Sequence, residues 1–495
     1  SLMNDMVVRL RAADPRHLYA DGSNNVLWDP AFQPTNDFMV SAKCRPPADP
    51  TKVLPARGSF CVFDGNDGHT QWGPAETRTD LSAALAGLPV PFVGHETGQW
   101  TVYPVFNEIP KYTGVTRAHD LERFRAIAER RGLLDQSADF QRASGALAAE
   151  LYREENELFL RSPGIGGFQH LDLQDYPGQG AALVGLADAF MDSKGVVTPE
   201  EFRHSNSPLV LLARFDRYTW TAGETYTADL QLAHYGAADL KGVATTWALV
   251  AADGRTVAEG SFPPADLPQG GLRNLGHVAA PLSGIAGPAR LDLVVRLGTV
   301  ATQRWPVWVY PAQIDTAPPA GVTIVRAFDT AAKRLLAEGR RVVLVPSDAN
   351  WADTVPGGYA TDFWNWPMFN GTPGTLGLLI QPQHPALAAF PTRFHSERQW
   401  SYLAHASTPV ILTGTPHALR PIVQVIDNYE RNEKLGLVFE AAVGPGRLLV
   451  CAVDLLGASL RDRPEARQLL ASLLAYAGSP AFAPAVPMDV AALDA

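Results

Sequence analysis

One carboxylate in this chain follows an apolar stretch at a position suited to catalysis. The segment PVPFVGHETGQW covers residues 89–100, and in a strand Glu96 would share a face with the apolar Phe92. In a parallel α/β barrel the carboxyl ends of the strands form the catalytic face, where a carboxylate can act on a glycosidic bond as nucleophile or general acid. The same pattern also fits a carboxylate that only hydrogen-bonds a neighbouring loop, so the spacing leaves both roles open.

His95, which precedes Glu96, does not begin a zinc motif. In H-E-x-x-H the second histidine would occupy position 99, where this chain has glutamine, and the surroundings predict a strand instead of a helix. A G-x-S-x-G elbow, a phosphate-binding loop and a dinucleotide-binding fingerprint are also missing from the sequence. We therefore expect no metal and no cofactor, and we assign His95 to substrate binding.

Polar side chains also follow a second apolar stretch, GGFQHLDLQDYPGQG at residues 166–180. We expect Asp172 and Gln174 to bind sugar hydroxyl groups, because a few polar groups fix the orientation of a ligand in its pocket. Trp100 and Tyr176 would stack on the face of the sugar ring, since aromatic side chains offer a large apolar surface. The sequence therefore predicts a carbohydrate site around Glu96.

A third segment, LYADGSNN at residues 18–25, would deliver further polar groups to the same rim. Asp21 and Ser23 are as well suited to forming a turn as to contacting a substrate. Asn24 and Asn25 offer both a donor and an acceptor, so we expect them to bind substrate.

The elements that must position these residues follow from the pattern of residues 1–205. Short apolar stretches alternate there with helical ones, which predicts a parallel α/β arrangement. Residues 45–88 are rich in Pro and Gly and predict a long excursion that shapes a binding site. Asp175 would cap the last helix. The expected strands are 17–21, 38–42, 90–96 and 167–172, and the expected helices are 2–13, 118–131, 138–160 and 178–191.

The hydrophobic period changes to two after residue 205. Residues 206–312 contain short alternating stretches separated by turns, which predicts an antiparallel β-sandwich. A Pro/Ala-rich linker follows, and the α/β pattern then returns over residues 321–480. The expected sandwich strands are 226–233, 244–251, 289–297 and 304–310, and the final domain is expected to close with a hairpin over 435–454 and a helix over 464–477.

The composition excludes several classes of protein. With 495 residues and 46% hydrophobic residues the chain can bury several cores. The 41 basic and 51 acidic side chains leave a net charge of −10, which has the wrong sign for a nucleic-acid binder. No apolar run is long enough to span a membrane. Cys44, Cys61 and Cys451 are too few for a disulfide framework, and we interpret Cys44 and Cys61 as free thiols.

At these residues the chain resembles glycoside hydrolase family 2, the group of β-galactosidases and β-glucuronidases. The segment RLRAADPRHLY at residues 9–19 resembles the approach to strand five of the family's (β/α)₈ barrel. VPFVGHETG resembles the end of strand seven, which carries the nucleophile, and GGFQHLD resembles strand eight. The resemblance implies that residues 1–205 are the C-terminal half of a (β/α)₈ barrel and that Glu96 is the nucleophile of a retaining glycosidase.

The same resemblance implies an acid/base glutamate that follows an asparagine at the end of strand four. None of the Asn-Glu pairs of this chain lies at a suitable place, and we interpret Glu157 and Glu433 as solvated charges. A retaining mechanism needs two carboxyl groups roughly 5–5.5 Å apart. Because the chain opens within an amphipathic helix, we expect the acid/base residue to lie upstream of Ser1 and the chain to be the C-terminal part of a longer protein.

Residues 321–480 resemble the glutamine-amidotransferase-like domains that are appended to some large glycosidases. An active amidotransferase needs a nucleophilic cysteine on a strand-to-helix turn with a histidine partner. Cys451 lies instead inside the apolar strand RLLVCAVDL, so we expect this domain to be inactive. WNWP at 364–367 and HSERQW at 395–400 are expected to form an interface or to border the sugar site.

The sequence therefore predicts a fragment of a retaining exo-β-glycosidase that hydrolyses terminal sugars of oligo- or polysaccharides and is inactive alone. The alternative is a non-catalytic carbohydrate-binding or assembly module that keeps the sandwich and the α/β domain. Carbohydrate is the expected partner, nucleic acid and membrane are not, and the sequence leaves a homo-oligomer open. The family resemblance favours a periplasmic or secreted location.

Overall fold

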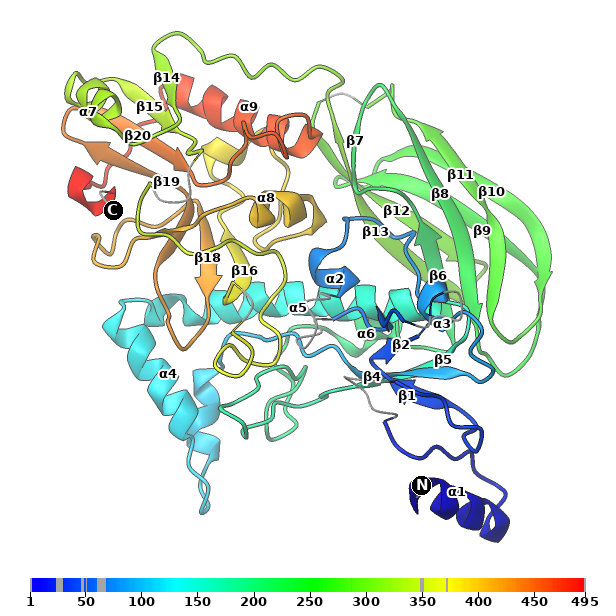
Figure 1. Ribbon diagram of the computed structural model, residues 1–495. Coiled ribbons are helices and arrows are strands. Elements are labelled where there is room, and N and C mark those ends of the chain that lie inside the picture. The colour runs from blue at the N-terminus through cyan, green and yellow to red at the C-terminus, as the bar shows by residue number, and fades with distance from the viewer. Residues whose placement is uncertain are drawn as a thin grey trace.

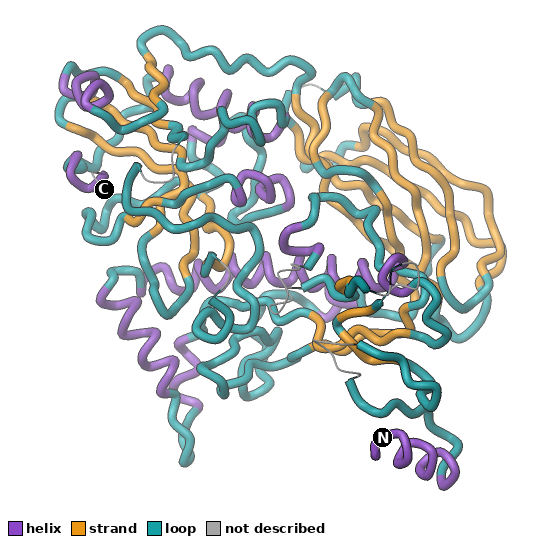
Figure 2. Tube along the Cα trace, viewed as in Figure 1, coloured by secondary structure: helices purple, strands orange, loops and turns teal. Residues whose placement is uncertain are grey.

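The structure, a computed structural model, describes residues 2–23, 30–45, 49, 51–59, 68–285, 287–347, 351–370 and 373–493. The chain forms three successive regions (Figure 1). The first contains a three-stranded parallel sheet, the second contains two packed sheets, and the third contains a mixed sheet. Figure 2 shows the strands of the second region gathered on the right of the molecule, whereas on the left the strands of the third region lie among helices. Across the described ranges, no helix is both long enough and apolar enough to span a membrane.

Three parallel strands form the sheet that carries Glu96. Their order is β1 (Met39–Ser41), β4 (Phe92–Thr97) and β5 (Ile165–His170), so Glu96 belongs to the central strand. Three strands do not make the half barrel that the sequence predicts, although their parallel order and their carboxyl ends agree with that expectation. The helix α1 (Leu2–Ala13) forms as expected, with one buried residue, and projects from this end of the molecule (Figure 1).

The strand expected at residues 17–21 does not form. The N–H of Tyr19 donates to the Asp37 carboxylate at 2.8 Å, and the N–H of Asp21 donates to the Asn36 side chain at 3.1 Å. Side chains therefore bind the backbone groups that a neighbouring strand would otherwise pair, which stabilises an irregular segment.

Two helices connect β4 to β5, as a parallel connection requires. They are α4 (His119–Arg130) and α5 (Ser137–Leu160). Leu147, Leu151 and Leu158 recur at helical spacing on α5 and are fully buried. The helix contacts both β5 and β16 (Thr375–Ile380) of the third region, and Figure 1 shows it crossing the molecule between them.

The sequence predicts Glu157 of α5 as a solvated charge, but the structure buries it. Glu157 is 3% exposed and accepts hydrogen bonds from the indole N–H of Trp305 at 3.0 Å and from Arg153 at 2.7 Å. The other expected solvated charge, Glu433, pairs with Arg131 at 2.5 Å. Both glutamates therefore hold elements together.

The helix expected at residues 178–191 is also absent. Gln179, Gly180 and Ala181 have positive φ angles of 54°, 81° and 66°, which a right-handed helix excludes. Asp175 consequently caps no helix. Its buried carboxylate pairs with Lys194 at 2.7 Å and accepts the N–H of Gly185 at 2.8 Å.

The second region is a pair of sheets whose inner faces share one core. Their neighbouring strands are antiparallel, except that β7 (Thr219–Thr221) runs parallel to β13 (Ala301–Tyr310). On β12, Leu291, Leu293 and Val295 are buried while the alternate residues point outward. The smaller sheet has the order β11 (Leu272–Pro281), β8 (Thr225–His234), β6 (Leu209–Arg214), and the larger has the order β10 (Thr256–Leu267), β9 (Leu240–Ala251), β12 (Ala289–Leu297), β13 (Ala301–Tyr310), β7 (Thr219–Thr221).

Part of this region that the sequence predicts as turn is a strand. Pro263 and Pro264 lie within β10, where the register with β9 shifts between Phe262 and Ala265. Proline has no N–H to donate, so strands accommodate it at sheet edges and bulges, and β10 is an edge strand.

The third region is a mixed sheet with helices packed against it. The thiol of Cys451 is fully buried in this sheet, which raises its pKa to about 12, and this agrees with an inert residue. The sheet order is β14 (Val322–Val325), β15 (Arg341–Leu344), β20 (Gly446–Cys451), β19 (Leu435–Val443), β18 (Val423–Asp427), β16, with β17 (Val410–Ile411) beside β19 and with helices α7 (Thr330–Ala337) and α9 (Pro464–Gly478).

The remaining elements are short. They are β2 (Lys43–Cys44), β3 (Leu54–Pro55), α2 (His69–Trp72), α3 (Ser82–Leu85), α6 (Pro199–Arg203), α8 (Ser401–His405) and the 3₁₀ helices η1 (Phe106–Lys111), η2 (Leu134–Gln136), η3 (Pro385–Leu387), η4 (Arg398–Trp400) and η5 (Val490–Leu493). The expected excursion at residues 45–88 thus contains little regular structure in its described part, and Cys61 lies outside the described residues.

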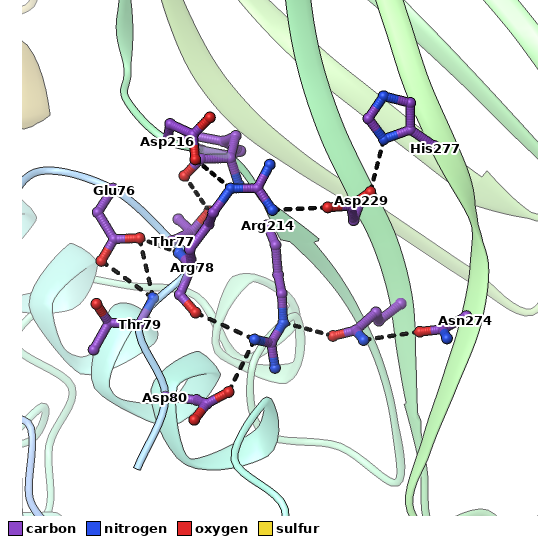
Figure 3. Close-up of polar contacts among 12 residues, drawn as sticks. Glu76, Thr77, Arg78, Thr79, Asp80, Arg214, Asp216, Asp229, Asn274 and His277 are labelled. Carbon is purple, nitrogen blue, oxygen red and sulfur yellow. Dashed lines mark hydrogen bonds and ion pairs between the residues drawn. The ribbon is translucent and has the colours of Figure 1, made fainter. Parts of the chain in front are cut away.

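Polar contacts join the three regions. The HSERQW segment is buried, and within it His395 pairs with Glu150 of α5 at 2.9 Å while Glu397 pairs with Arg290 of the sandwich at 2.9 Å. The loop that precedes α3 contacts the sandwich through three ion pairs, Arg78 with Asp216, Arg78 with Asp229 at 2.7 Å and Arg214 with Asp80 at 3.0 Å (Figure 3). The HSERQW segment is therefore an interface within the molecule.

Candidate active site around Glu96

Glu96 lies near the carboxyl end of β4, the central strand of the parallel sheet. Its φ angle of 48° is in the left-handed region, unlike the φ angles of the other residues of β4. The register between β4 and β5 shifts between Gly94 and Thr97. This bulge turns the Glu96 side chain out of the regular alternation, and the side chain is 45% exposed. The carboxylate is thus accessible to a ligand.

The surroundings of Glu96 favour its ionised form. The nearest carboxylate oxygen, Oε1, lies 3.4 Å from Nε2 of His95. The hydrogen bond from His95 lowers the pKa of Glu96, and Arg57 and Gln99 lower it further, whereas partial burial opposes them. Glu96 is therefore an anion at neutral pH, as a nucleophile must be.

Two side chains also hold the backbone of Glu96. Its carbonyl accepts hydrogen bonds from the Arg57 guanidinium and from the Gln99 amide, the latter at 3.1 Å. Arg57 is 6% exposed, and its guanidinium carbon lies 5.1 Å from the centre of the Phe363 ring. The backbone of the catalytic candidate is thus fixed from the long excursion and from the third region.

Glu155 of α5 supports the same backbone from below the surface. It is 1% exposed, and its carboxylate accepts the N–H groups of Gly58 at 3.1 Å, Ser59 at 2.9 Å and Gly98 at 2.9 Å. Burial raises the pKa of Glu155, and the nearby Arg57 acts in the opposite direction. One carboxylate therefore ties the turn after Glu96 to the loop that carries Arg57.

The turn after Glu96 leaves no room for a side chain at Gly98. Its φ angle is 86°, and a Cβ atom there would lie 2.1 Å from a ring carbon of Tyr152. Glycine at this position therefore lets the backbone approach α5 closely enough for Glu155 to reach it.

The third region contributes to the site through WNWP. The N–H of Trp364 donates to the carbonyl of Gln99 at 3.0 Å, and its indole N–H donates to the Gln179 side chain at 3.0 Å. The Trp364 ring lies 5.8 Å from that of Tyr176, which is 42% exposed. Tyr176 is thus an exposed aromatic ring on the segment that follows β5.

The remaining residues predicted to bind substrate have separate outcomes. Asp172 and Gln174 follow β5, and the N–H of Leu171 donates to the carbonyl of Thr97 at 3.1 Å, so this segment runs beside the end of β4. Trp100 is fully buried in a core cluster with residues of α5, so it is a packing residue in this structure and not an open stacking surface. Asn24 and Asn25 lie outside the described residues.

Three residues that hold Glu96 were not found from the sequence: Arg57, Gln99 and Glu155. Arg57 lies in a Pro/Gly-rich stretch and Glu155 within a helix, and neither position has a spacing that links it to Glu96. In the sequence, Gln99 is distinguished only by occupying the position of the second histidine of a zinc motif. Over the described ranges, no group of three or more His, Cys, Asp or Glu side chains is arranged to hold a metal ion.

Family models match two parts of the chain. Residues 224–311 match a domain of unknown function, DUF8488, and residues 323–495 match another domain of unknown function, DUF8487. The first range lies within the pair of packed sheets and the second begins at the mixed sheet. No curated protein matches the chain.

Several solved structures that match the chain at low TM-score are glycoside hydrolases, and another is Spo0M, a sporulation control protein from Bacillus subtilis. The exo-chitosanase of Amycolatopsis orientalis is 17% identical over 39% of this chain and 22% of that chain, with a TM-score of 0.26. A variant of that enzyme bound to PNP-β-D-glucosamine is 14% identical over 53% of this chain and 33% of that chain, with a TM-score of 0.28. The β-glucuronidase of Parabacteroides merdae is 11% identical over 28% of this chain and 21% of that chain, with a TM-score of 0.16. The chain thus spans a third or less of the length of each of these three glycoside hydrolase structures.

Proposed function

We propose that this chain carries the nucleophile side of a retaining exo-β-glycosidase, with Glu96 as the nucleophile. The observation that carries the proposal is the placement of an accessible, ionised carboxylate at the carboxyl end of the central parallel strand. In glycosidases that retain configuration, such a carboxylate attacks the anomeric carbon and forms a glycosyl-enzyme ester, which water then hydrolyses.

The surrounding residues suit that role. The two hydrogen bonds to the Glu96 carbonyl and the Glu155 carboxylate beneath the turn fix the backbone that carries the reacting carboxylate, and a fixed backbone lowers the entropic cost of attack. The exposed ring of Tyr176 offers a stacking surface for a sugar, and Asp172 and Gln174 offer hydrogen bonds to its hydroxyl groups. The hydrogen bond from His95 lowers the pKa of the proposed nucleophile.

We place the acid/base carboxyl group outside the described residues. The groups with the largest effects on the pKa of Glu96 are His95, Arg57 and Gln99, and none of these three is a carboxylate. A missing general acid costs on the order of 10²–10⁴-fold in rate. We therefore expect the chain alone to leave natural disaccharides intact, and turnover of them at ordinary enzyme rates would contradict this part of the proposal.

Covalent labelling tests the nucleophile without a general acid. A 2,4-dinitrophenyl leaving group needs little protonation, and a fluorine at C2 slows hydrolysis of the ester. Incubation with 2-deoxy-2-fluoro glycosides of gluco, galacto and manno configuration is expected to add one fluoroglycosyl group to the intact protein, and peptide mass spectrometry is expected to find it on Glu96. Binding of an oligosaccharide with no labelling by any of the three would favour a non-catalytic carbohydrate-binding module instead.

The acid limb of the labelling rate should report the hydrogen bond from His95. Because that bond lowers the pKa of Glu96, the rate is expected to stay constant around neutral pH and to fall only as the pH falls through the lowered pKa. In His95→Ala the bond is lost, the pKa of Glu96 rises, and the limb should move to higher pH. His277→Ala, which removes an exposed histidine paired with Asp229 in the sandwich, is the control and should leave the limb in place.

A further inference from the structure

A cleft of about 740 Å³ lies between the outer face of the larger sandwich sheet and the third region. Its walls are formed by residues 250–254 and by parts of β12 and β13 on one side, and by residues 382–393 on the other. The indole N–H of Trp308 donates to the carbonyl of Pro391 at 3.1 Å and so links the two walls. None of the lining residues comes from the region that contains Glu96.

The strand pattern explains why charged groups gather in this cleft. Residues that alternate with the buried side chains of β12 point away from the sandwich core, and these are Arg290, Asp292, Val294 and Arg296. Arg304 on β13 lies directly opposite Val294 in the antiparallel register, so it projects from the same face. Arg393 approaches from the opposite wall.

Part of this positive charge is already neutralised. Arg290 pairs with Asp292 at 3.0 Å and with the buried Glu397 at 2.9 Å. Arg304 lies 3.8 Å from Asp292 and is 60% exposed, and Arg393 lies 3.6 Å from Glu397 and is 51% exposed. Each of these two guanidinium groups keeps donors that face solvent.

Arg296 has no ion pair with any residue that the structure describes, and its side chain is exposed. Arg296, Arg304 and Arg393 therefore leave a net positive cleft on a protein whose net charge is −10. Guanidinium groups bind carboxylate and sulfate groups through two parallel hydrogen bonds, which favours them as recognition groups for such anions.

We propose that this cleft binds an oligosaccharide that carries carboxylate or sulfate groups. Several arginines spread over two walls match repeated anionic groups along a chain, and a volume of 740 Å³ has room for more than one sugar ring. Only the choice of a carbohydrate as the ligand rests on the proposed function. The requirement that this ligand be negatively charged comes from the arginines of the cleft itself. The cleft would hold an acidic part of a polysaccharide away from Glu96.

Titration calorimetry of the full chain tests this site. Hexagalacturonate supplies carboxylates only, a heparin hexasaccharide supplies sulfates as well, and maltohexaose is the neutral control. At least one acidic hexasaccharide is expected to bind, and its affinity is expected to fall by about tenfold or more in the double variant Arg296→Ala/Arg304→Ala, since the loss of even one bidentate pair costs about a factor of ten. Both side chains are exposed, so the variant should fold. Arg334→Ala, an exposed arginine on α7, should bind like the parent.

Several outcomes would overturn the site. They are unchanged binding in the double variant, maltohexaose binding as tightly as the acidic sugars, sulfate ion alone competing at equal concentration, or an oligothymidylate binding more tightly through the same arginines. Glu96→Gln should bind the acidic hexasaccharide normally. If the full chain binds an acidic hexasaccharide but Glu96 is not labelled, the proposed catalytic role alone is rejected. If Glu96 is labelled but no acidic hexasaccharide binds, the proposed cleft site alone is rejected.

Discussion

Glu96→Gln is expected to abolish release of dinitrophenol from activated β-glycosides, with a loss of about 10³-fold or more relative to the parent chain. The amide is nearly isosteric with the carboxylate, so the fold should be unchanged, but it lacks the charge that attacks the anomeric carbon. Stopped assays with a dinitrophenyl glycoside that labels the parent would measure the loss. Circular dichroism and the unfolding midpoint would confirm that the variant is folded.

A second variant at the same position separates loss of the nucleophile from loss of the site. Glu96→Gly leaves space for a small anion, so added azide is expected to restore release of dinitrophenol and to yield a glycosyl azide with the anomeric configuration opposite to the substrate. Asp172→Asn is the matched control for removal of a neighbouring carboxylate. Release by Glu96→Gln at close to the parent rate would remove Glu96 from the mechanism and direct attention to Asp172.

Glu155→Ala is expected to lower the free energy of unfolding by about 3–5 kcal/mol, because it leaves three buried N–H groups without their acceptor and removes the negative charge that offsets Arg57. Urea unfolding would measure the change. Glu155→Gln should lie between the parent and Glu155→Ala, since the amide oxygen can still accept while its N–H₂ group faces a donor. Glu129→Ala, at an exposed position of α4, should change stability by no more than about 0.5 kcal/mol.

The same variants separate a role in positioning Glu96 from a role in stability. If Glu155 holds the turn after Glu96, labelling of folded Glu155→Gln should be slower than in the parent, and its acid limb should keep the position set by His95. A folded Glu155→Gln protein that labels at the parent rate would show that Glu155 stabilises the fold without positioning the nucleophile.

Elements with a strong local period were predicted closely from the sequence. The helix at 138–160 and the strands at 226–233 and 289–297 correspond to α5, β8 and β12 within two residues at each end. Their apolar residues recur with a period of 3.6 residues in the helix and of two residues in the strands. Burial of the apolar face formed in this way is sufficient to select a helix or a strand. The predictions were wrong for two segments in which local periodicity does not decide the structure. Residues 17–21 are held by the side chains of Asn36 and Asp37 instead of forming a strand, and residues 179–181 have positive φ angles that exclude the helix expected at 178–191.

For the candidate site, the sequence alone determined that a carboxylate ends an apolar strand, because alternation and strand length are local properties. What holds that carboxylate was decided only in the tertiary structure. Arg57 lies 39 residues away in the chain and its guanidinium binds the Glu96 carbonyl, and Glu155 lies 57 residues beyond Gly98 and accepts its N–H. Such contacts depend on how the excursion and α5 pack together, and packing between distant segments leaves no periodic trace in the sequence.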